Sequence, residues 1–186
     1  MTHVAELVDG RDRPVLVALD GRSGAGKSTL AGELAATTGV AVIDGDDFYT
    51  GRSAQEWDAM TPAERVESCM DWRRQRSVLE SLYRGEVATW QPYDWEADDG
   101  RLADRTLLCD PTWVVILEGA YSARPELADL LDLRVLLSIP EDVRRSQLLA
   151  REGDDYRAEW EARWAAAEEF YFERVMPPDA FDVVVG

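Results

Sequence analysis

The residues best suited to chemistry form a glycine-rich segment that follows a short apolar run near the N-terminus. The segment reads Gly21-Arg22-Ser23-Gly24-Ala25-Gly26-Lys27-Ser28 and matches the pattern G-x-x-x-x-G-K-[ST] at every fixed position. Glycine leaves no Cβ in the way, so the backbone amides of such a loop can turn toward phosphate oxygens. The lysine adds a positive charge for the β- and γ-phosphates, and the serine hydroxyl can bind Mg²⁺. We therefore expect this loop and Thr29 to bind a nucleoside triphosphate.

Lys27 also indicates which nucleotide to expect. It is the only lysine among the 20 basic residues of the chain, and arginine supplies every other cation. A guanine-specific protein would need a second lysine in a motif of the type N-K-x-D, and this chain has none to offer. The sequence therefore predicts ATP with Mg²⁺ as the cofactor, and Lys27 as a catalytic residue that balances phosphate charge.

Alternating strands and helices must position this loop. Apolar runs predict strands, whereas capping residues and prolines predict where helices begin and end. The predicted strands are 15–19, 40–43, 113–117, 133–138 and 182–185, and the predicted helices are 28–36, about 61–83, one that begins at 140, and about 156–176. Such alternation is typical of a parallel sheet with helices on both faces. We therefore expect the α/β fold of P-loop NTPases, of the nucleoside or nucleotide kinase type, with a parallel five-stranded sheet and ligands at the carboxyl ends of its strands.

Composition and charge exclude several classes of partner. The formal net charge of −17 repels nucleic acids and anionic membranes. No uninterrupted apolar run of about 18 residues could span a bilayer, and the first residues are acidic where a secretory signal needs a basic start. Cys69 and Cys109 lack the spacing of metal ligands or redox pairs, so we expect them to be packing residues. We expect a cytoplasmic protein that binds neither nucleic acid nor membrane, as a monomer or a homodimer.

The segment after the second predicted strand, Asp44-Gly45-Asp46-Asp47-Phe48-Tyr49, resembles the D-x-F-Y segment of the uridine/cytidine kinase family, within the wider phosphoribulokinase and pantothenate kinase group. The resemblance runs through most of the chain. It implies that Asp46 is the catalytic base that accepts the proton of the acceptor hydroxyl, and that Tyr49 shapes the acceptor pocket. A carboxylate held near a hydroxyl can orient it and take its proton late in a loose phosphoryl transfer, which agrees with this role.

Three further residues resemble the family on the acceptor side. Asp71, in M-D-W, falls where the family has an aspartate that hydrogen-bonds sugar hydroxyls, although a carboxylate on a helix surface is the alternative. The segment P-Y-D-W with the later Arg101 resembles the family's P-x-Y-D-F segment and its arginine, which implies that Tyr93 stacks on the acceptor ring and that Arg101 binds the acceptor. The family's histidine in this loop has no counterpart, because Asp98 and Asp99 stand there. The identity of the acceptor is therefore left open.

The resemblance also implies metal ligands and catalytic arginines. Glu118, directly before a glycine, resembles the family's E-G at the end of a strand, where a carboxylate can hold Mg²⁺ directly or through water, beside the substrate. Ser28 and Asp46 are the other expected metal ligands. Arg144 and Arg151 align with arginines of the family's lid, which can neutralise charge on the transferred phosphoryl group. Pairing with neighbouring glutamates at the surface is the alternative for both.

These observations predict one P-loop kinase domain over residues 1–186, with an acceptor-side insert at about 50–105 and a short lid at about 140–160. We expect an ATP-dependent kinase that phosphorylates a hydroxyl of a small molecule, above all of a nucleoside. A second hypothesis is a kinase for another hydroxylated metabolite or an antibiotic. A third is a regulatory module that binds ATP without catalysis.

Overall fold

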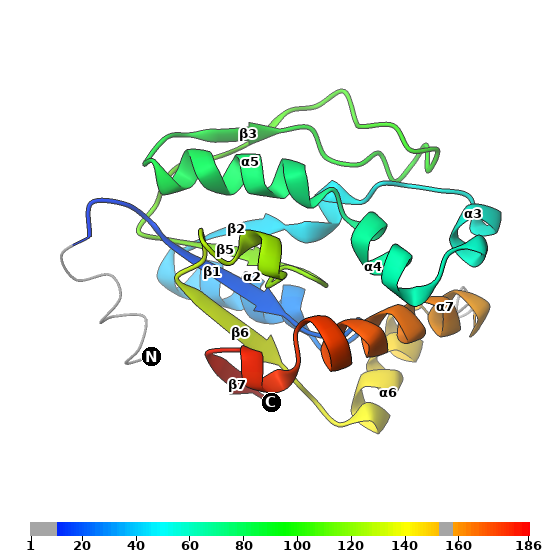
Figure 1. The fold of residues 1–186 in the computed structure, drawn as a ribbon. Coiled ribbons are helices and arrows are strands. Elements are labelled where there is room, and N and C mark those ends of the chain that lie inside the picture. The colour runs from blue at the N-terminus through cyan, green and yellow to red at the C-terminus, as the bar shows by residue number, and fades with distance from the viewer. Residues whose placement is uncertain (1–10, 153–157) are drawn as a thin grey trace.

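The computed structural model describes residues 11–152 and 158–186. Its centre is a five-stranded sheet in the order β2-β5-β1-β6-β7, with every neighbouring pair parallel (Figure 1). The strands are β1 (Val15–Asp20), β2 (Ala41–Asp44), β5 (Val114–Glu118), β6 (Leu133–Leu137) and β7 (Val183–Val185). Each predicted strand is present to within about one residue at each end. The predicted α/β fold with five parallel strands is confirmed.

Helices cover both faces of this sheet because its strands are apolar on both sides. Alternate residues of β1 face opposite directions, as the two-residue period of a strand requires. Val17 packs in the cluster beneath α2 (Lys27–Thr38), whereas Leu16 packs in the cluster beneath α5 (Trp72–Tyr83). A sheet covered on both faces leaves only its strand ends open, so the carboxyl edge is where a site can form.

The prediction of one helix over 61–83 is wrong, because the structure divides this segment in two. The first helix, α4 (Pro62–Cys69), begins where predicted, with a capping box at Thr61. Met70 then adopts an extended conformation and pairs with Tyr49 in an isolated β-bridge. This pairing needs an extended backbone, which a continuous helix could not supply. The second helix, α5, follows at once.

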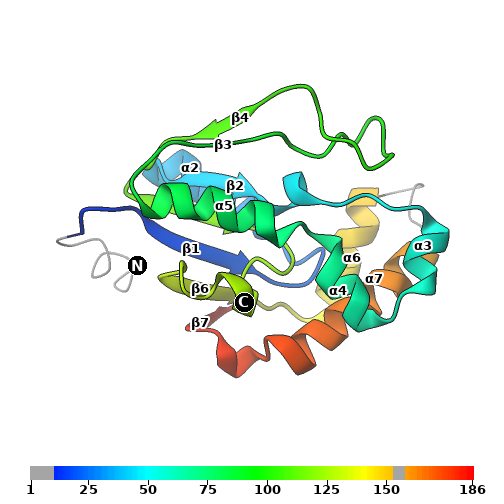
Figure 2. The ribbon, with the colours of Figure 1, turned by 45° about the horizontal axis from the view of Figure 1, so that its top comes forward.

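An antiparallel pair of short strands, β3 (Ala88–Trp90) and β4 (Leu107–Cys109), was not predicted from the sequence. The pair runs along the outer side of α5 (Figure 2). Three residues are too few to show a clear period-two pattern. The segment at about 50–105 contains α3 (Ala54–Ala59), α4, α5 and β3, whereas β4 lies just beyond it. The role of this segment as an acceptor-side insert stays a prediction.

The C-terminal part supplies two helices near the carboxyl edge of the sheet. Helix α6 (Glu141–Glu152) starts one residue after its predicted start. Helix α7 (Ala158–Phe170) passes into a π-helical turn, Tyr171–Val175, so the predicted helix at about 156–176 is α-helical only as far as Phe170. Residues 156 and 157, and the middle of the predicted lid, lie outside the described residues. Within the described residues, no helix is both long and apolar enough to cross a membrane.

Candidate active site

The phosphate loop joins β1 to α2 at the carboxyl edge of the sheet. Three of its glycines have positive φ angles, 152° at Gly21, 80° at Gly24 and 94° at Gly26, and residues with a Cβ rarely adopt such conformations. A Cβ on Gly21 would lie 2.5 Å from the carbonyl oxygen of Leu137 in β6. The backbone path of the loop, and not only its ligand, therefore requires glycine.

The Lys27 ammonium lies inside this loop. Its Nζ donates to the carbonyl oxygens of Gly21, at 2.9 Å, and Arg22, at 3.1 Å. A buried ammonium needs such partners, because burial of an unpaired charge is costly. An ammonium has three donor protons, so Lys27 can hold the loop closed and still bind a phosphate oxygen.

A cavity of about 610 Å³, which we call the phosphate cavity, lies along the loop and the start of α2. Six of the nine predicted cofactor residues line it: Ser23, Gly24, Gly26, Lys27, Ser28 and Thr29. The other three support the loop from outside this cavity. Gly21 accepts from Lys27, the Arg22 guanidinium lies 5.8 Å from the ring centroid of Phe172, and Ala25 is buried. The middle of the loop and the N-terminus of α2 therefore face the cavity, where a phosphate chain would lie.

Two carboxylates face the loop from neighbouring strands. Asp46 follows β2 and Glu118 ends β5, and the two strands pair so that Asp44 lies opposite Glu118. Burial raises the pKa of Glu118 to about 7, and the negative charge of Asp44 adds to this shift while a hydrogen bond with Ser28 opposes it. Burial by the surrounding protein also raises the pKa of Asp46, although this carboxylate is open to the cavity.

These side chains fit Mg²⁺ that arrives with a nucleotide. The described residues contain no group of three or more His, Cys, Asp or Glu side chains that could hold a metal by itself. Mg²⁺ needs fewer, because it binds through one or two carboxylates together with phosphates and water. The Ser28 hydroxyl and the carboxylates of Asp46 and Glu118 line the same cavity and are all hard oxygen ligands.

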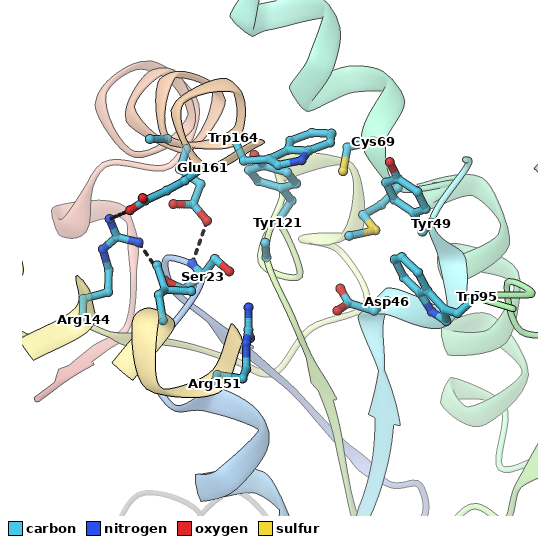
Figure 3. A pocket seen from close by; sticks show the side chains of 15 residues that line it. Ser23, Asp46, Tyr49, Cys69, Trp95, Tyr121, Arg144, Arg151, Glu161 and Trp164 are labelled. Carbon is cyan, nitrogen blue, oxygen red and sulfur yellow. Dashed lines mark hydrogen bonds and ion pairs between the residues drawn. The ribbon is translucent and has the colours of Figure 1, made fainter. Parts of the chain in front are cut away.

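A second cavity of about 270 Å³, which we call the aromatic cavity, lies beside the first (Figure 3). Tyr49, Trp95, Tyr121 and Trp164 line it. The ring of Trp95 stacks on Tyr49 with 5.1 Å between centroids and 14° between planes, and Trp164 meets Tyr49 edge-on at 6.3 Å. Trp95 is 51% exposed. Its ring is therefore held in one orientation while much of its surface remains available to a ligand.

The two cavities share one boundary. Asp46 and Arg151 line both cavities, as do Ser23 and Ala120. Figure 3 shows the side chains of Asp46 and Arg151 directed into the space between them, from the end of β2 and from α6. The boundary between the cavities therefore carries both a carboxylate and a guanidinium.

The two arginines of α6 predicted to be catalytic have different surroundings. Arg144 is only 4% exposed and donates to Glu141 at 2.8 and 2.6 Å and to the carbonyl oxygen of Ser23 at 2.8 Å. It also lies 3.8 Å from Glu161. The pairing with a neighbouring glutamate that the sequence left open is therefore present, although Arg144 still lines the aromatic cavity. Arg151 instead stands at the boundary between the cavities.

Three predicted acceptor residues line neither of these two cavities. Asp71 caps α5 by accepting from a backbone amide of its first turn, and Arg101 pairs with its neighbour Asp99. Tyr93 is 1% exposed and donates from its hydroxyl to Asp98 at 2.8 Å. The expected stacking of Tyr93 on an acceptor does not agree with this burial. Trp95, two residues later, presents its ring to the cavity instead.

Helix α7 contributes residues that the sequence did not single out for function. Glu161, Trp164, Ala165 and Glu168 all line the aromatic cavity. Trp164, Ala165 and Glu168 lie three, four and seven residues after Glu161, which is the spacing of residues on one face of a helix. This spacing alone indicates only that one face of the helix is covered, so it could not assign a role to Glu168.

Known proteins resemble this chain in sequence and fold. The Phosphoribulokinase / Uridine kinase family matches residues 16–162. The uridine kinase of Clostridium perfringens (strain SM101) is 29% identical over 150 residues, which cover 75% of this chain and 69% of that protein. The uridine kinase of Deinococcus deserti is 29% identical over 148 residues, covering 77% and 70%. The structure of a possible uridine kinase from Bacillus stearothermophilus superposes with a TM-score of 0.67 at 22% identity, covering 100% of this chain and 98% of that one.

A five-stranded parallel sheet with a G-x-x-x-x-G-K-S loop between β1 and α2 defines the class of P-loop NTPases. The family match spans well over half of the chain, so the protein belongs to the phosphoribulokinase/uridine kinase family. It is therefore an ATP-dependent kinase that transfers phosphate to a hydroxyl. The family resemblance read from the sequence is confirmed.

Proposed function

We propose that this kinase transfers the γ-phosphoryl group of MgATP to a hydroxyl of an uncharged, ring-bearing small molecule, and that a nucleoside is the leading candidate. The observation that carries the proposal is the position of Asp46, which lines the phosphate cavity and the aromatic cavity alike. Phosphoryl transfer needs donor and acceptor in line on either side of the transferred group. Ligands in these two cavities would meet at the boundary beside Asp46.

On the nucleotide side, the chain supplies positioning and positive charge. The loop amides and Lys27 bind the phosphate chain, and the N-terminus of α2 points its partial positive charge at it. Ser28, Glu118 and Asp46 would hold Mg²⁺ there, and the ion would supply positive charge that offsets the charge of the phosphates. Arg151, at the boundary, faces the charge that spreads over the transferred group.

On the acceptor side, Asp46 orients the hydroxyl and accepts its proton. The raised pKa of this carboxyl makes it a better base than an aspartate with an ordinary pKa. Arg144 has another part in this proposal. Its donors are engaged by Glu141 and the Ser23 carbonyl, so it holds the loop rather than the phosphoryl group.

The walls of the aromatic cavity favour a ring and disfavour an anion. Trp95 offers an exposed face on which a planar ring can stack. Three carboxylates line this space, those of Asp46, Glu161 and Glu168, against the two guanidiniums of Arg144 and Arg151. The buried Arg144 is already paired with Glu141. An acceptor with a carboxylate or phosphate group would find repulsion there. The uridine kinases among the relatives support a nucleoside.

A different acceptor hydroxyl, of a sugar, a vitamin precursor or an antibiotic, is the second candidate. It is favoured by the loop of Asp98 and Asp99, which stand where the family has a histidine. A panel of nucleosides and these alternatives, assayed for ADP release, separates the two candidates. Acceptors matched in size but differing in a carboxylate test the charge argument in the same assay.

Substitution of Asp46 tests the proposed mechanism. With the best acceptor of the panel, Asp46→Asn should lower kcat by about 10²–10⁴-fold, the usual contribution of a positioned base. Affinity for MgADP, measured by calorimetry, separates the two roles of Asp46: a change of less than about threefold indicates a base, whereas a larger loss indicates that Asp46 also holds Mg²⁺.

Asp47→Asn is the matched control for this experiment. Asp47 accepts from the Trp90 indole at 2.8 Å and lines neither cavity, and an asparagine oxygen can accept the same bond. Its kcat should stay near the wild-type value. The proposed role of Asp46 would be contradicted by full turnover in the Asp46→Asn protein. If no acceptor raises ADP release above the rate with water, the protein is a nucleotide-binding module instead.

A further inference from the structure

The third residue of the phosphate loop, Ser23, is held on both sides of its backbone by the two C-terminal helices. Its amide donates to Oε1 of Glu168 in α7 at 2.6 Å, and its carbonyl oxygen accepts from Nη1 of Arg144 in α6 at 2.8 Å. Both side chains are nearly inaccessible, at 3% and 4% exposure. The loop conformation at Ser23 therefore depends on groups far along the chain, and not only on its own glycines.

A second contact ties the same region of the C-terminal segment to the start of the loop. The Tyr171 hydroxyl donates to Oδ2 of Asp20 at 2.9 Å, and Oδ1 of Asp20 accepts the amide of Gly21 at 2.7 Å. Asp20 is fully buried. Glu168 and Tyr171 are three residues apart, so they project from the same side of the helical segment. This side of the helical segment therefore contacts the phosphate loop region through both Glu168 and Tyr171.

The other half of the same face lines the aromatic cavity. Glu161, Trp164 and Ala165 lie there, one to two turns before Glu168. A helix is stiff over this distance, so a shift at one end moves the other. Helix α7 therefore joins the wall of the acceptor site to the amide of Ser23 through a single rigid element (Figure 3).

We propose that Glu168 is a positioning residue, which holds the phosphate loop in its triphosphate-binding conformation through the Ser23 amide and couples that conformation to the acceptor site through α7. The inference rests on the proposed function, because it needs the loop to bind a nucleotide. Glu168 would not touch the reacting atoms. Its carboxylate fixes the direction of one loop amide, and a loop with that amide released would sample other conformations before it binds phosphate.

The chemistry of the bond explains why a glutamate suits this position. A buried carboxylate is costly unless it is hydrogen-bonded and compensated. Glu168 accepts a short bond and has the positive charges of Lys27, Arg144 and Arg22 near it. The contact thus depends on reach and on one acceptor oxygen. Aspartate keeps the charge but is shorter by one methylene, whereas glutamine keeps the reach and the acceptor oxygen without the charge.

These two substitutions separate reach from charge. In calorimetry with MgADP and with a non-hydrolysable ATP analogue, which need no acceptor, Glu168→Asp should weaken binding about tenfold, because the Ser23 amide loses its partner. Glu168→Gln should stay within about threefold of the wild type. With the best acceptor, KM for ATP should follow the same order. Melting temperatures, measured in parallel, show whether either variant has lost its fold.

Glu169→Gln is the control, because this neighbour on α7 is exposed and should leave every value unchanged. Wild-type affinity in the Glu168→Asp protein would overturn the proposal. So would equal losses in the Glu168→Asp and Glu168→Gln proteins, because the reach of the side chain to the Ser23 amide would then not explain the loss of affinity. Tyr171→Phe, which removes the hydroxyl that donates to Asp20, is an independent test: it should weaken nucleotide binding, but by less than Glu168→Asp does. A wild-type protein that binds neither nucleotide would contradict the proposed function itself.

Discussion

Burial separates the side chains that can touch a substrate from those that cannot. Tyr93 and Trp95 lie two residues apart in one loop, and both are aromatic. Tyr93 is closed off at 1% exposure with its hydroxyl bound to Asp98, whereas Trp95 is 51% exposed and stacks on Tyr49. A residue pattern can place an aromatic side chain in a loop, but only its packing decides which ring meets the ligand.

The role of Trp95 leads to a prediction at this scale. Trp95→Ala should raise KM for the acceptor about tenfold, because stacking of a ring on an aromatic side chain contributes on the order of 1–3 kcal/mol. KM for ATP should change little, because Trp95 does not line the phosphate cavity. Steady-state kinetics with each substrate varied in turn measures both values. Trp113→Ala, at a 47% exposed tryptophan that lines neither cavity, is the control, and an equal effect in both proteins would contradict the prediction.

At the scale of elements, α6 is packed directly on the phosphate loop. A Cβ on Gly24 would lie 2.5 Å from Cγ of Leu148 and 3.1 Å from the carbonyl oxygen of Arg144, both in α6. Contacts this short cannot be accommodated without movement of the helix or the loop. The segment predicted as a lid at about 140–160 therefore begins with a helix that rests on the loop. Its action as a lid stays a prediction.

Gly24→Ala tests this contact. The added methyl group and the positive φ of 80° should together displace the loop or α6, and affinity for MgADP should fall by at least about tenfold. Calorimetry measures the affinity, and addition of Leu148→Ala should restore part of it by making room. Unchanged affinity in the Gly24→Ala protein would show that the packing is loose.

Gly32→Ala is the matched glycine control. Gly32 lies in the middle of α2, and a Cβ there would have no heavy atom within 4 Å. Because alanine is the better helix former, this change should raise the free energy of unfolding by about 0.5–1 kcal/mol and leave nucleotide affinity unchanged. Urea denaturation measures the first value and calorimetry the second.

At the scale of the whole molecule, the two edges of the sheet serve different purposes. The carboxyl edge carries the phosphate loop, Asp46 and Glu118, and burial raises the pKa of both carboxyls. Near the opposite edge, Asp132 accepts from Arg13 at 2.7 and 2.8 Å and from the Leu16 amide at 2.9 Å. The carboxylates at the carboxyl edge line a cavity where a ligand can contact them, whereas Asp132 near the opposite edge is paired with Arg13 inside the protein.

Asp132 makes stability depend on pH in a predictable direction. Burial alone would raise the pKa of this carboxyl, but the hydrogen bonds from Arg13, the Leu16 amide and Arg11, together with the positive charge of Arg13, outweigh burial and lower the pKa below its ordinary value. The stabilisation is therefore complete above the unfolded-state pKa and is lost as the pH falls through the folded-state pKa. Asp132→Asn should reduce the free energy of unfolding at pH 7 by about 1–3 kcal/mol.

The same stabilisation should disappear in acid. As the pH falls below about 4, the ordinary pKa of an aspartate in an unfolded chain, and on through the lowered pKa of Asp132 in the folded protein, the difference between wild type and the Asp132→Asn protein should shrink. Urea denaturation at a series of pH values measures it. Asp129→Asn, at an exposed carboxylate paired with Arg76, is the control and should have little effect. A difference that is the same at every pH would contradict the electrostatic explanation.

The sequence by itself determined the features that depend on near neighbours. The phosphate loop, the five strands and the capping box at Thr61 are each encoded within a few consecutive residues, so their patterns can be read directly. Asp46 came from such a pattern together with the family resemblance. The structure then placed it at the boundary of two cavities.

Only the tertiary structure decided which distant side chains complete the site. The bond from Ser23 to Glu168 joins residues 145 positions apart, and that from Tyr171 to Asp20 joins residues 151 apart. The break at Met70 likewise follows from pairing with Tyr49 in another segment. Such contacts leave no periodic signal in the chain, because they arise when segments pack and not when neighbouring residues set the local backbone conformation.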